Sequence, residues 1–241
     1  MLSVGDLAGL WTRSLLVLPD GTRDTATEVV WLQGPGGYAD LRQAPGQPDF
    51  SHVRCLDDLT AADCAWLATQ QGFAGTLSCA DGYFEWGREI DYQPPAAQPD
   101  SGRLFWQGDI LVETGRYADY LERWHRDPAC GVAPCGEVAL VSPGDGRPMR
   151  LVRTGDCFMF ACGRAETRFV APTLAECVAG AADLATARAL LDCEISFGRI
   201  AGGAWRILRS TLPFRVGAVL DPAGMGTLGL RDTSVFININ L

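Results

Sequence analysis

The sequence predicts an all-β, mainly antiparallel fold with one or two short helices, arranged as two consecutive β-barrel domains. Short β-branched and aromatic runs of alternating character recur along the chain. Clusters of glycine, proline and aspartate separate these runs at the spacing typical of sandwiches and barrels. The 241 residues, of which 47% are hydrophobic, suffice to bury the core of one or two domains.

The predicted strands divide into two groups along the chain. The first group covers residues 10–17, 28–33, 38–43, 75–79, 82–92, 103–107, 110–114 and 120–126. The second group covers residues 137–142, 149–154, 157–163, 193–200, 204–210, 214–220 and 234–241. Turn-forming segments at residues 19–21, 80–82 and 143–146 supply glycines and aspartates that tolerate positive φ, so consecutive strands are expected to pair antiparallel.

Helical spacing of apolar residues appears in only two segments. Residues 59–68 contain a threonine cap, and residues 173–191 are rich in alanine, although Gly180 is expected to split the second helix. The turn-forming stretch 127–136 is the best candidate linker. It divides the chain into an N-terminal barrel, residues 1–130, and a C-terminal barrel or half-barrel, residues 136–241.

The composition excludes several classes of function. A formal net charge of −9 and a pI near 4.7 argue against nucleic acid as a partner, because phosphate backbones are bound by clustered positive charge. All 20 basic residues are arginine. The absence of lysine excludes a Schiff-base enzyme, a pyridoxal-phosphate anchor and a phosphate-loop lysine.

Neither the N-terminus nor any apolar stretch resembles a targeting or membrane-spanning segment, so we expect a cytoplasmic protein without membrane partners. The nine cysteines are irregularly spaced, which indicates reduced, mostly buried thiols and no structural disulfide. The pairs Cys130/Cys135 and Cys157/Cys162 do not have the spacing of a zinc knuckle, so no metal is expected.

The segment Gly224–Gly229 matches the dinucleotide-binding glycine pattern letter for letter. The residues that follow it read as a strand, whereas a nucleotide site needs a helix N-terminus to hold the pyrophosphate. We therefore expect a hairpin at these glycines and no cofactor.

Two sets of residues resemble known families. Gly9-Leu10-Trp11 resembles the Gly-x-Trp motif of lipocalins and other calycins, in which the tryptophan closes one barrel end and packs against an arginine; the alternative is a turn glycine before a core tryptophan. Short segments spread over most of the chain resemble the Hri family of fungal and bacterial proteins, known in yeast as casein-kinase-associated proteins. This second resemblance implies two consecutive calycin-like domains but no catalytic residues, and it rests on Trp31, Tyr120–Trp124, Val141–Pro143, Cys162–Arg164 and Gly203–Trp205.

Strand alternation mixes aromatic and charged residues on single faces. One face of the strand 83–92 carries Phe84, Trp86, Arg88, Ile90 and Tyr92, and the other carries Glu85, Glu89 and Asp91. Two further faces combine Tyr38, Asp40 and Arg42, and Tyr120, Glu122, Trp124 and Arg126. Charges facing inward must pair with each other or meet a polar ligand. The alternative is that these faces point to solvent; the flanking tryptophans favour the interior.

Three functions follow from this pattern. The first is binding of a small, partly aromatic or acyl ligand with a polar end, by Tyr38, Arg42, Trp86, Arg88, Glu122 and Trp124. The alternative is a cofactor-free isomerase, hydratase or lyase that uses Asp91, Glu113 or Glu122 as acid or base. The third is a protein-interaction scaffold, which a homodimer would suit. His52 and His125 lack any nucleophile motif, which argues against a hydrolase.

Overall fold

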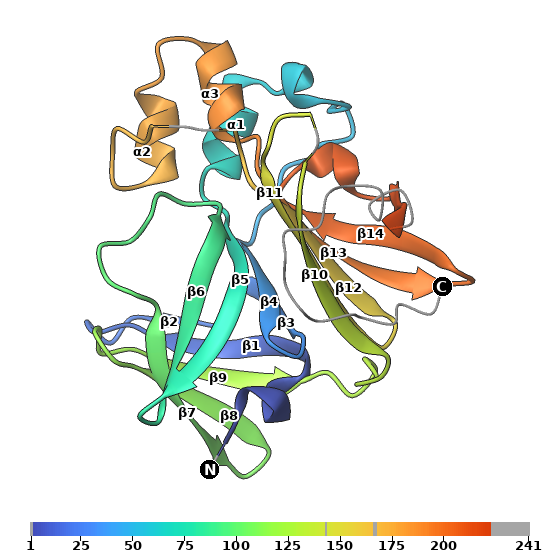
Figure 1. Cartoon of the computed structure of the whole chain (residues 1–241). Coiled ribbons are helices and arrows are strands. Elements are labelled where there is room, and N and C mark those ends of the chain that lie inside the picture. The colour runs from blue at the N-terminus through green and yellow to red at the C-terminus, as the bar shows by residue number, and fades with distance from the viewer. Residues whose placement is uncertain (1, 143, 166–167, 223–241) are drawn as a thin grey trace.

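The protein consists of a closed eight-stranded antiparallel barrel followed by a six-stranded antiparallel sheet, with three short helices gathered near one end of both (Figure 1). The computed structural model describes residues 2–142, 144–165 and 168–222. The predicted all-β barrel fold is confirmed, with strands as the dominant elements of the described chain.

The barrel is built from consecutive antiparallel strands, and pairing of the first with the last closes it. Its strands are β1 (Gly9–Val17), β3 (Glu28–Gln33), β4 (Gly37–Gln43), β5 (Gln71–Ala80), β6 (Tyr83–Asp91), β7 (Ser101–Gln107), β8 (Ile110–Gly115) and β9 (Leu121–Arg126). A short strand, β2 (Arg23–Asp24), pairs with the end of β1. The hairpin between β5 and β6 turns at Asp81 and Gly82, both with positive φ, as the sequence predicted.

The second sheet is also a meander. Its strands follow one another in space as β10 (Cys135–Val141), β11 (Pro148–Thr154), β12 (Cys157–Cys162), β13 (Glu194–Ala201), β14 (Ala204–Ser210) and β15 (Val219–Leu220). Within the described residues no pairing joins β10 to β15, so this sheet stays open there. Residues 127–134 connect the two units.

One predicted strand is partly wrong. Within residues 214–220, only Val219–Leu220 pair as a strand, and Pro213–Arg215 form the 3-10 helix η3. Pro213 at its first turn fixes φ near a helical value and offers no N–H to a ladder, which favours the helical turn over a strand. The expected strand 234–241 and the hairpin at Gly224–Gly229 lie outside the described residues.

The helices are α1 (Ala61–Leu67), α2 (Leu174–Ala179) and α3 (Leu184–Leu190). Thr60 and Thr173 form capping boxes at α1 and α2, and Asp183 caps α3. The predicted helix 173–191 is therefore split, and Gly180 is the C-cap of α2, as expected. In the described part of the chain, none of the helices is long and apolar enough to cross a membrane.

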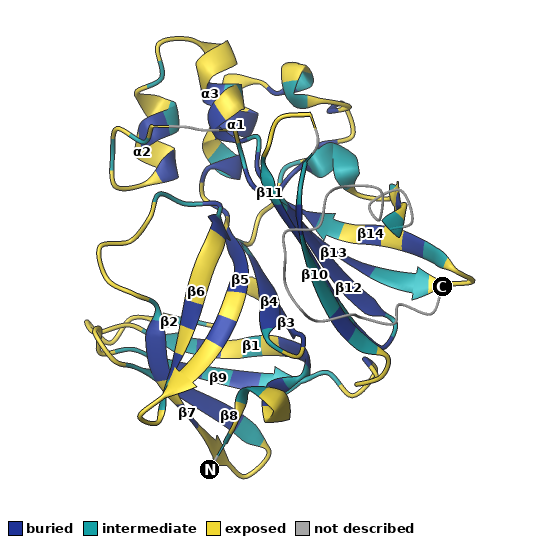
Figure 2. Cartoon of the chain, viewed as in Figure 1, coloured by how far each residue is buried: buried dark blue, intermediate teal, exposed yellow. Residues whose placement is uncertain are grey.

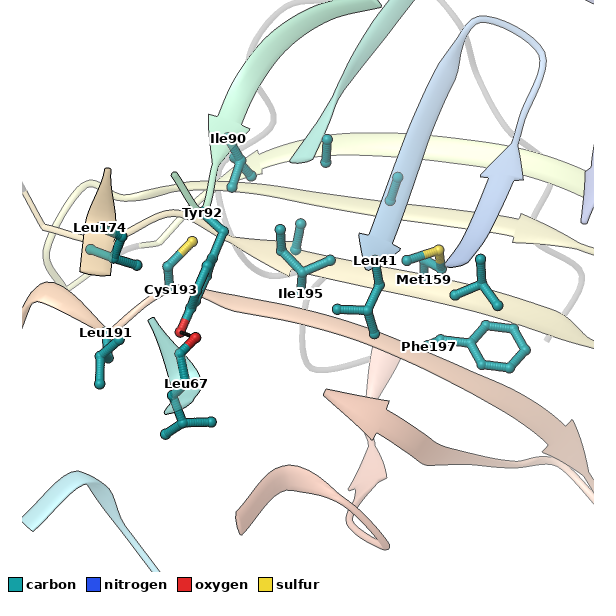
Figure 3. Packing of buried hydrophobic residues seen from close by; sticks show 14 of the residues in the cluster. Leu41, Leu67, Ile90, Tyr92, Met159, Leu174, Leu191, Cys193, Ile195 and Phe197 are labelled. Atoms are coloured by element: carbon teal, nitrogen blue, oxygen red, sulfur yellow. Dashed lines mark hydrogen bonds between the residues drawn. The ribbon is translucent and has the colours of Figure 1, made fainter. Parts of the chain in front are cut away.

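The largest hydrophobic core lies between the two units, not inside the barrel. Outward-facing side chains of β3 to β6 pack against one face of β11 to β13 and against the helices. Figure 3 shows Leu41 and Ile90 of the barrel in this core, together with Met159, Ile195 and Phe197 of the second sheet. Figure 2 shows the same strands buried where the units meet. The second sheet thus covers one side of the barrel wall.

The barrel interior holds a separate core dominated by tryptophan. Trp31 lies at its centre, with ring centroids 5.8 Å from Trp11, 5.9 Å from Trp86 and 5.4 Å from Trp124. The Trp11 ring is stacked on Trp31 and the other two rings meet it edge to face. Both arrangements add about 0.5–1.5 kcal/mol per pair beyond area burial. The central part of the barrel is therefore filled by side chains.

Polar contacts join the second sheet to the barrel at two places, the turn between β3 and β4 and strand β6. The Glu137 carboxylate of β10 accepts hydrogen bonds from the N–H groups of Gly36 and Gly37. Arg150 of β11, itself buried, donates to Glu89 of β6 at 2.7 Å. Charge-assisted bonds at a buried interface set its register as well as its stability.

Candidate functional site at the open end of the barrel

One end of the barrel is closed by Trp11. This residue is fully buried, and its indole N–H donates to the carbonyl of Leu7 at 2.7 Å. The Arg126 guanidinium lies 4.7 Å from the centre of the Trp11 ring and donates to the carbonyls of Asp6 and Ala8. The arrangement expected from the Gly-x-Trp resemblance, a tryptophan packed against an arginine at one barrel end, is therefore present.

The opposite end, which we call the mouth, is lined by charge. On β4 the predicted face of Tyr38, Asp40 and Arg42 points inward, as expected. Arg42 donates from Nε to Asp40 at 2.8 Å and lies 5.1 Å from the centre of the Phe73 ring. Its pKa is raised because the attraction of Asp40 and Glu122 outweighs the desolvation that would lower it.

Glu122 of β9 also faces inward, as predicted, and has two arginine partners. Arg13 donates to it at 2.5 Å, and Arg42 lies 3.4 Å away. Arg13 also pairs with Asp24 at 2.9 Å. Sequence analysis did not select Arg13, although it alternates with Trp11 along β1 in the same aromatic-and-charged pattern.

A β-bulge redirects the end of β6. Gly75 pairs with Arg88 whereas Ala74 pairs with Ile90, which leaves Glu89 as the extra residue. Arg88 therefore keeps the inward direction of Trp86, but Ile90 and Tyr92 turn outward into the core between the units. The prediction that Arg88, Ile90 and Tyr92 share one face is therefore wrong. The inserted residue reverses the alternation, so Asp91 points into the barrel together with Arg88.

Arg88 is the centre of a second ion-pair group at the mouth. It donates to Asp91 at 3.0 Å and to Asp100 at 2.6 Å, and its guanidinium lies 3.6 Å from the centre of the Phe73 ring. Burial raises the pKa of Asp91, and the charge of Arg88 opposes this shift only in part. Asp91 is therefore a carboxyl group of increased proton affinity beside a fixed cation.

Glu113 of β8 is fully enclosed in the barrel. Its carboxyl oxygens accept hydrogen bonds from the Tyr120 hydroxyl at 2.7 Å and from the Trp124 indole N–H at 3.1 Å. Burial, with the nearby charge of Glu122 in second place, raises the pKa of Glu113 well above its ordinary value. This carboxyl group is consequently held in its neutral form under conditions in which a solvated glutamate is ionised.

An open cleft of about 930 Å³ lies over the mouth, between the barrel and the second unit. Its lining comes from strand β6, the segment after it, the approach to β9 and the second unit, and includes Trp86, Arg88, Asp100, Tyr120, Arg164 and Phe169. Cavities of this size accommodate small organic ligands.

The structure brings only part of the predicted site to this cleft. Trp86, Arg88 and the catalytic candidate Asp91 line it. The other predicted residues lie deeper in the barrel, outside the cleft lining: Tyr38, Arg42, Glu113, Glu122 and Trp124. The Tyr38 hydroxyl donates to the carbonyl of Gly87 at 3.4 Å, and burial raises the pKa of this phenol.

Several lining residues had no signal in the strand pattern. Asp100 lies on a connection between strands. Alternation places Tyr120, just before β9, on the face of Glu122 but does not single it out as a cleft residue. Arg164 and Phe169 belong to the second unit, and only their tertiary contacts place them here. The three prolines of residues 93–100, followed by Asp100, are a sequence feature that could have drawn attention to this loop.

The cleft is acidic overall. Its lining contains the carboxylates of Glu85, Glu89, Asp91 and Asp100, against the guanidinium groups of Arg88 and Arg164. Arg164 is engaged with backbone carbonyls of Asp91, Tyr92 and Leu190 at 2.7–3.1 Å. Both lining arginines thus already have partners, which leaves an excess of hydrogen-bond acceptors facing the cleft.

No family model and no curated protein matches the chain. Among solved structures, the chain resembles an uncharacterized protein from Saccharomyces cerevisiae, with a TM-score of 0.50 and 11% sequence identity. The similarity covers 83% of this chain and 84% of the yeast chain. At this identity the likeness shows a shared fold and carries no functional information.

Proposed function

We propose that the protein binds a small ligand in the cleft at the barrel mouth, with an aromatic or acyl body and a polar end. The observation that carries this proposal is the Arg88–Asp100 ion pair at the floor of a cleft of about 930 Å³. Such a site combines apolar walls with a few oriented polar groups, as ligand sites in barrels do. The closed end at Trp11 leaves the mouth as the route into the barrel.

The charges of the cleft select the polar end of the ligand. Arg88 is already shared between Asp91 and Asp100, so an incoming carboxylate would compete with two fixed anions. An amine or hydroxyl group instead finds acceptors and meets an excess of carboxylates. The ligand proposed is therefore a hydrogen-bond donor at its polar end, with Phe169 and Trp86 available to its apolar body.

The test is a ligand screen with matched pairs of compounds. Aliphatic and aromatic amines and polyols are compared with carboxylic acids of the same skeleton, by thermal shift and by tryptophan fluorescence. We expect shifts with the amines or polyols, and loss of those shifts in Asp100→Asn. Asp109→Asn, an exposed aspartate in the β7–β8 hairpin, is the control and should behave as wild type.

A response confined to carboxylic acids, or one retained in full by Asp100→Asn, would reject this ligand class and this site. Absence of any response across the panel would reject small-molecule binding at the mouth.

A second candidate function, proton transfer, is favoured by the contact between Glu113 and Tyr120. A neutral, buried carboxyl group lies one hydrogen bond from a phenol that lines the cleft. Raised carboxyl pKa values are how enzymes keep a general acid protonated near neutral pH. This pair could relay a proton to a bound substrate in an isomerase, hydratase or lyase reaction.

The discriminating experiment is hydrogen exchange into the bound compound in D₂O, followed by NMR. Catalysis predicts that ligands from the screen acquire deuterium at carbon with wild-type protein and not with Tyr120→Phe, while Tyr120→Phe still binds them. Tyr117→Phe, also at the cleft, is the control. Binding without exchange would favour a binding protein.

Two further assignments are proposals of the same kind. Membership of the Hri family is supported by the short matches along the sequence and by the two-unit architecture. A cytoplasmic location is supported by the free state of all nine cysteines, since thiols persist in reducing compartments. Fractionation of cells that express the tagged protein would test the location.

A further inference from the structure

Three metal-binding side chains meet beside the segment that connects the two units. Cys130 belongs to this segment, Asp156 lies in the turn between β11 and β12, and Cys157 is the first residue of β12. The two sulfur atoms and a carboxylate oxygen all lie within 4.8 Å of one another. Both cysteines are buried and Asp156 is exposed, so the group has one side in the protein and one in solvent.

We propose that Cys130, Cys157 and Asp156 bind a divalent thiophilic cation of the zinc class, with water completing a tetrahedral site. Two sulfurs and one oxygen are a donor set suited to zinc, and an open fourth position is common at such centres. Zn–S bonds of about 2.3 Å place two sulfurs about 3.8 Å apart in a tetrahedron. A contraction of about 1 Å or less from the observed spacing therefore completes the geometry.

The backbone holds the two segments close enough for this site. Gly155 has φ of 58°, and a Cβ at this position would lie 2.5 Å from the carbonyl oxygen of Gly131. Only glycine allows this approach with this conformation. The Cys130 thiol donates to the carbonyl of Thr154 at 3.1 Å, which fixes its position against β11.

The charges around the group suit a bound cation. Each thiol releases its proton on binding, so two thiolates, one carboxylate and M²⁺ carry a net charge of −1. Arg199 donates to Asp156 at 3.0 Å and to Asp127 at 3.3 Å, and can balance that charge as an outer partner. A shallow cleft of about 470 Å³, lined by Asp156, Gly131 and Gly155, lies at the exposed member of the group.

The spacing of the cysteines conceals this group in the sequence. In the sequence, Cys130 is close to Cys135 and Cys157 is close to Cys162, and zinc knuckles join cysteines that are close along the chain. The cysteines that meet belong instead to different pairs, and Cys157 and Cys162 face opposite sides of the second sheet, as expected. A cation here would tie residues 127–134 to the second sheet, outside the ligand cleft.

The test is titration of the reduced, metal-free full-length protein with Co²⁺, followed by displacement with Zn²⁺. We expect one equivalent of Co²⁺ to give thiolate-to-metal charge-transfer absorption with the ligand-field bands of a tetrahedral ion, and Zn²⁺ to abolish both. Cys130→Ser and Cys157→Ser should lose the stoichiometric site. Asp156→Asn retains both thiols and should keep the charge-transfer band with a shifted ligand field.

Two variants separate this site from other thiols and from misfolding. Cys79→Ser changes an exposed cysteine and should bind as wild type. Arg199→Gln should weaken binding by about 10-fold, the lower end of outer-partner effects, without loss of the absorption bands. The proposal fails if wild type shows no one-to-one charge-transfer band, or if Cys130→Ser and Cys157→Ser, folded by circular dichroism, retain it.

Discussion

Glu113 and Glu122 lie directly opposite each other on β8 and β9, both inside the barrel, yet among the described residues arginines pair only with Glu122 of the two. Glu113 accepts hydrogen bonds from two neutral donors, Tyr120 and Trp124. Two adjacent buried carboxylates repel each other when both are charged. The barrel avoids this repulsion by placing arginines beside Glu122 and keeping Glu113 neutral, so substitutions of the two residues should have different effects.

The first prediction concerns pH and Glu113. Its pKa is raised in the folded protein, so above its ordinary value of 4.5 the unfolded chain gives up this proton first and stability falls as pH rises. The loss ends once pH exceeds the folded-state pKa and amounts to about 1.4 kcal/mol per pH unit of that window. Glu113→Gln should remove this loss, so its Tm should rise relative to wild type as pH increases.

Thermal melts of both proteins from about pH 5 to pH 8 measure this difference within the predicted window. Glu85→Gln, at an exposed position on β6, serves as the control and should parallel wild type. If the difference in Tm between Glu113→Gln and wild type stays constant over this pH range, Glu113 does not titrate as predicted.

The second prediction concerns Glu122. Glu122→Gln removes the charge that faces Arg13 and Arg42, whose side chains are only 3% and 16% exposed. Arg13 keeps Asp24 and Arg42 keeps Asp40 as partners, so the variant loses charge-assisted bonds without isolating either cation. A decrease of about 1.5–3 kcal/mol in the free energy of unfolding is expected in urea titration. Glu28→Gln breaks an exposed pair with Arg209 and should cost less than about 1 kcal/mol. Equal losses in the two variants would contradict the prediction.

The third prediction concerns the contact between the two units at Gly37. A Cβ at Gly37 would collide with the side chains of Arg150 and Glu137, which can move aside only by giving up their bonds across the interface. Gly37→Ala should lower the free energy of unfolding by about 1.5–3 kcal/mol, the range for charged hydrogen bonds.

Gly36→Ala is the matched control, because its Cβ would meet Glu137 at 3.5 Å, an ordinary contact. Limited proteolysis of the connecting segment, alongside thermal unfolding, should show faster cleavage for Gly37→Ala alone. Indistinguishable behaviour of the two variants would mean that these bonds do not hold the units together.

The fourth prediction concerns the closed end of the barrel. Arg126→Met keeps the length of the side chain but removes the donors to Asp6 and Ala8 and the cation over Trp11. We expect a loss of about 1.5–3 kcal/mol, and a changed near-ultraviolet circular dichroism spectrum as Trp11 loses its fixed position. Arg103→Met, exposed and stacked on Tyr83, should leave that spectrum unchanged.

The sequence was sufficient to predict the fold class and the inward faces of β4 and β9. In those strands the alternation is uninterrupted, so Asp40, Arg42 and Glu122 point to the interior together with aromatic neighbours. The same rule failed in β6, because the bulge at Glu89 depends on pairing with β5, which no single strand reveals.

The rest of the mouth could not be predicted for a different reason. Asp100 lies on a connection between strands, and Arg164 reaches the cleft from the second unit. Alternation describes which side of a strand a residue occupies, and it contains no information on which strands or loops from another unit lie opposite. Trp86 and Arg88 are therefore the part of the cleft lining that the alternation within one strand can predict.

Because of its bulge, strand β6 contacts the second unit and also lines the cleft. Glu89, the inserted residue, forms a salt bridge with Arg150 of the second sheet. Ile90 beside it is buried in the core between the two units. Arg88 and Asp91, on either side, form the floor of the cleft. Sliding of the second sheet would therefore move Arg88 and Asp91. A ligand bound in the cleft and the position of the second unit would then be thermodynamically linked, each shifting the other by the same free energy.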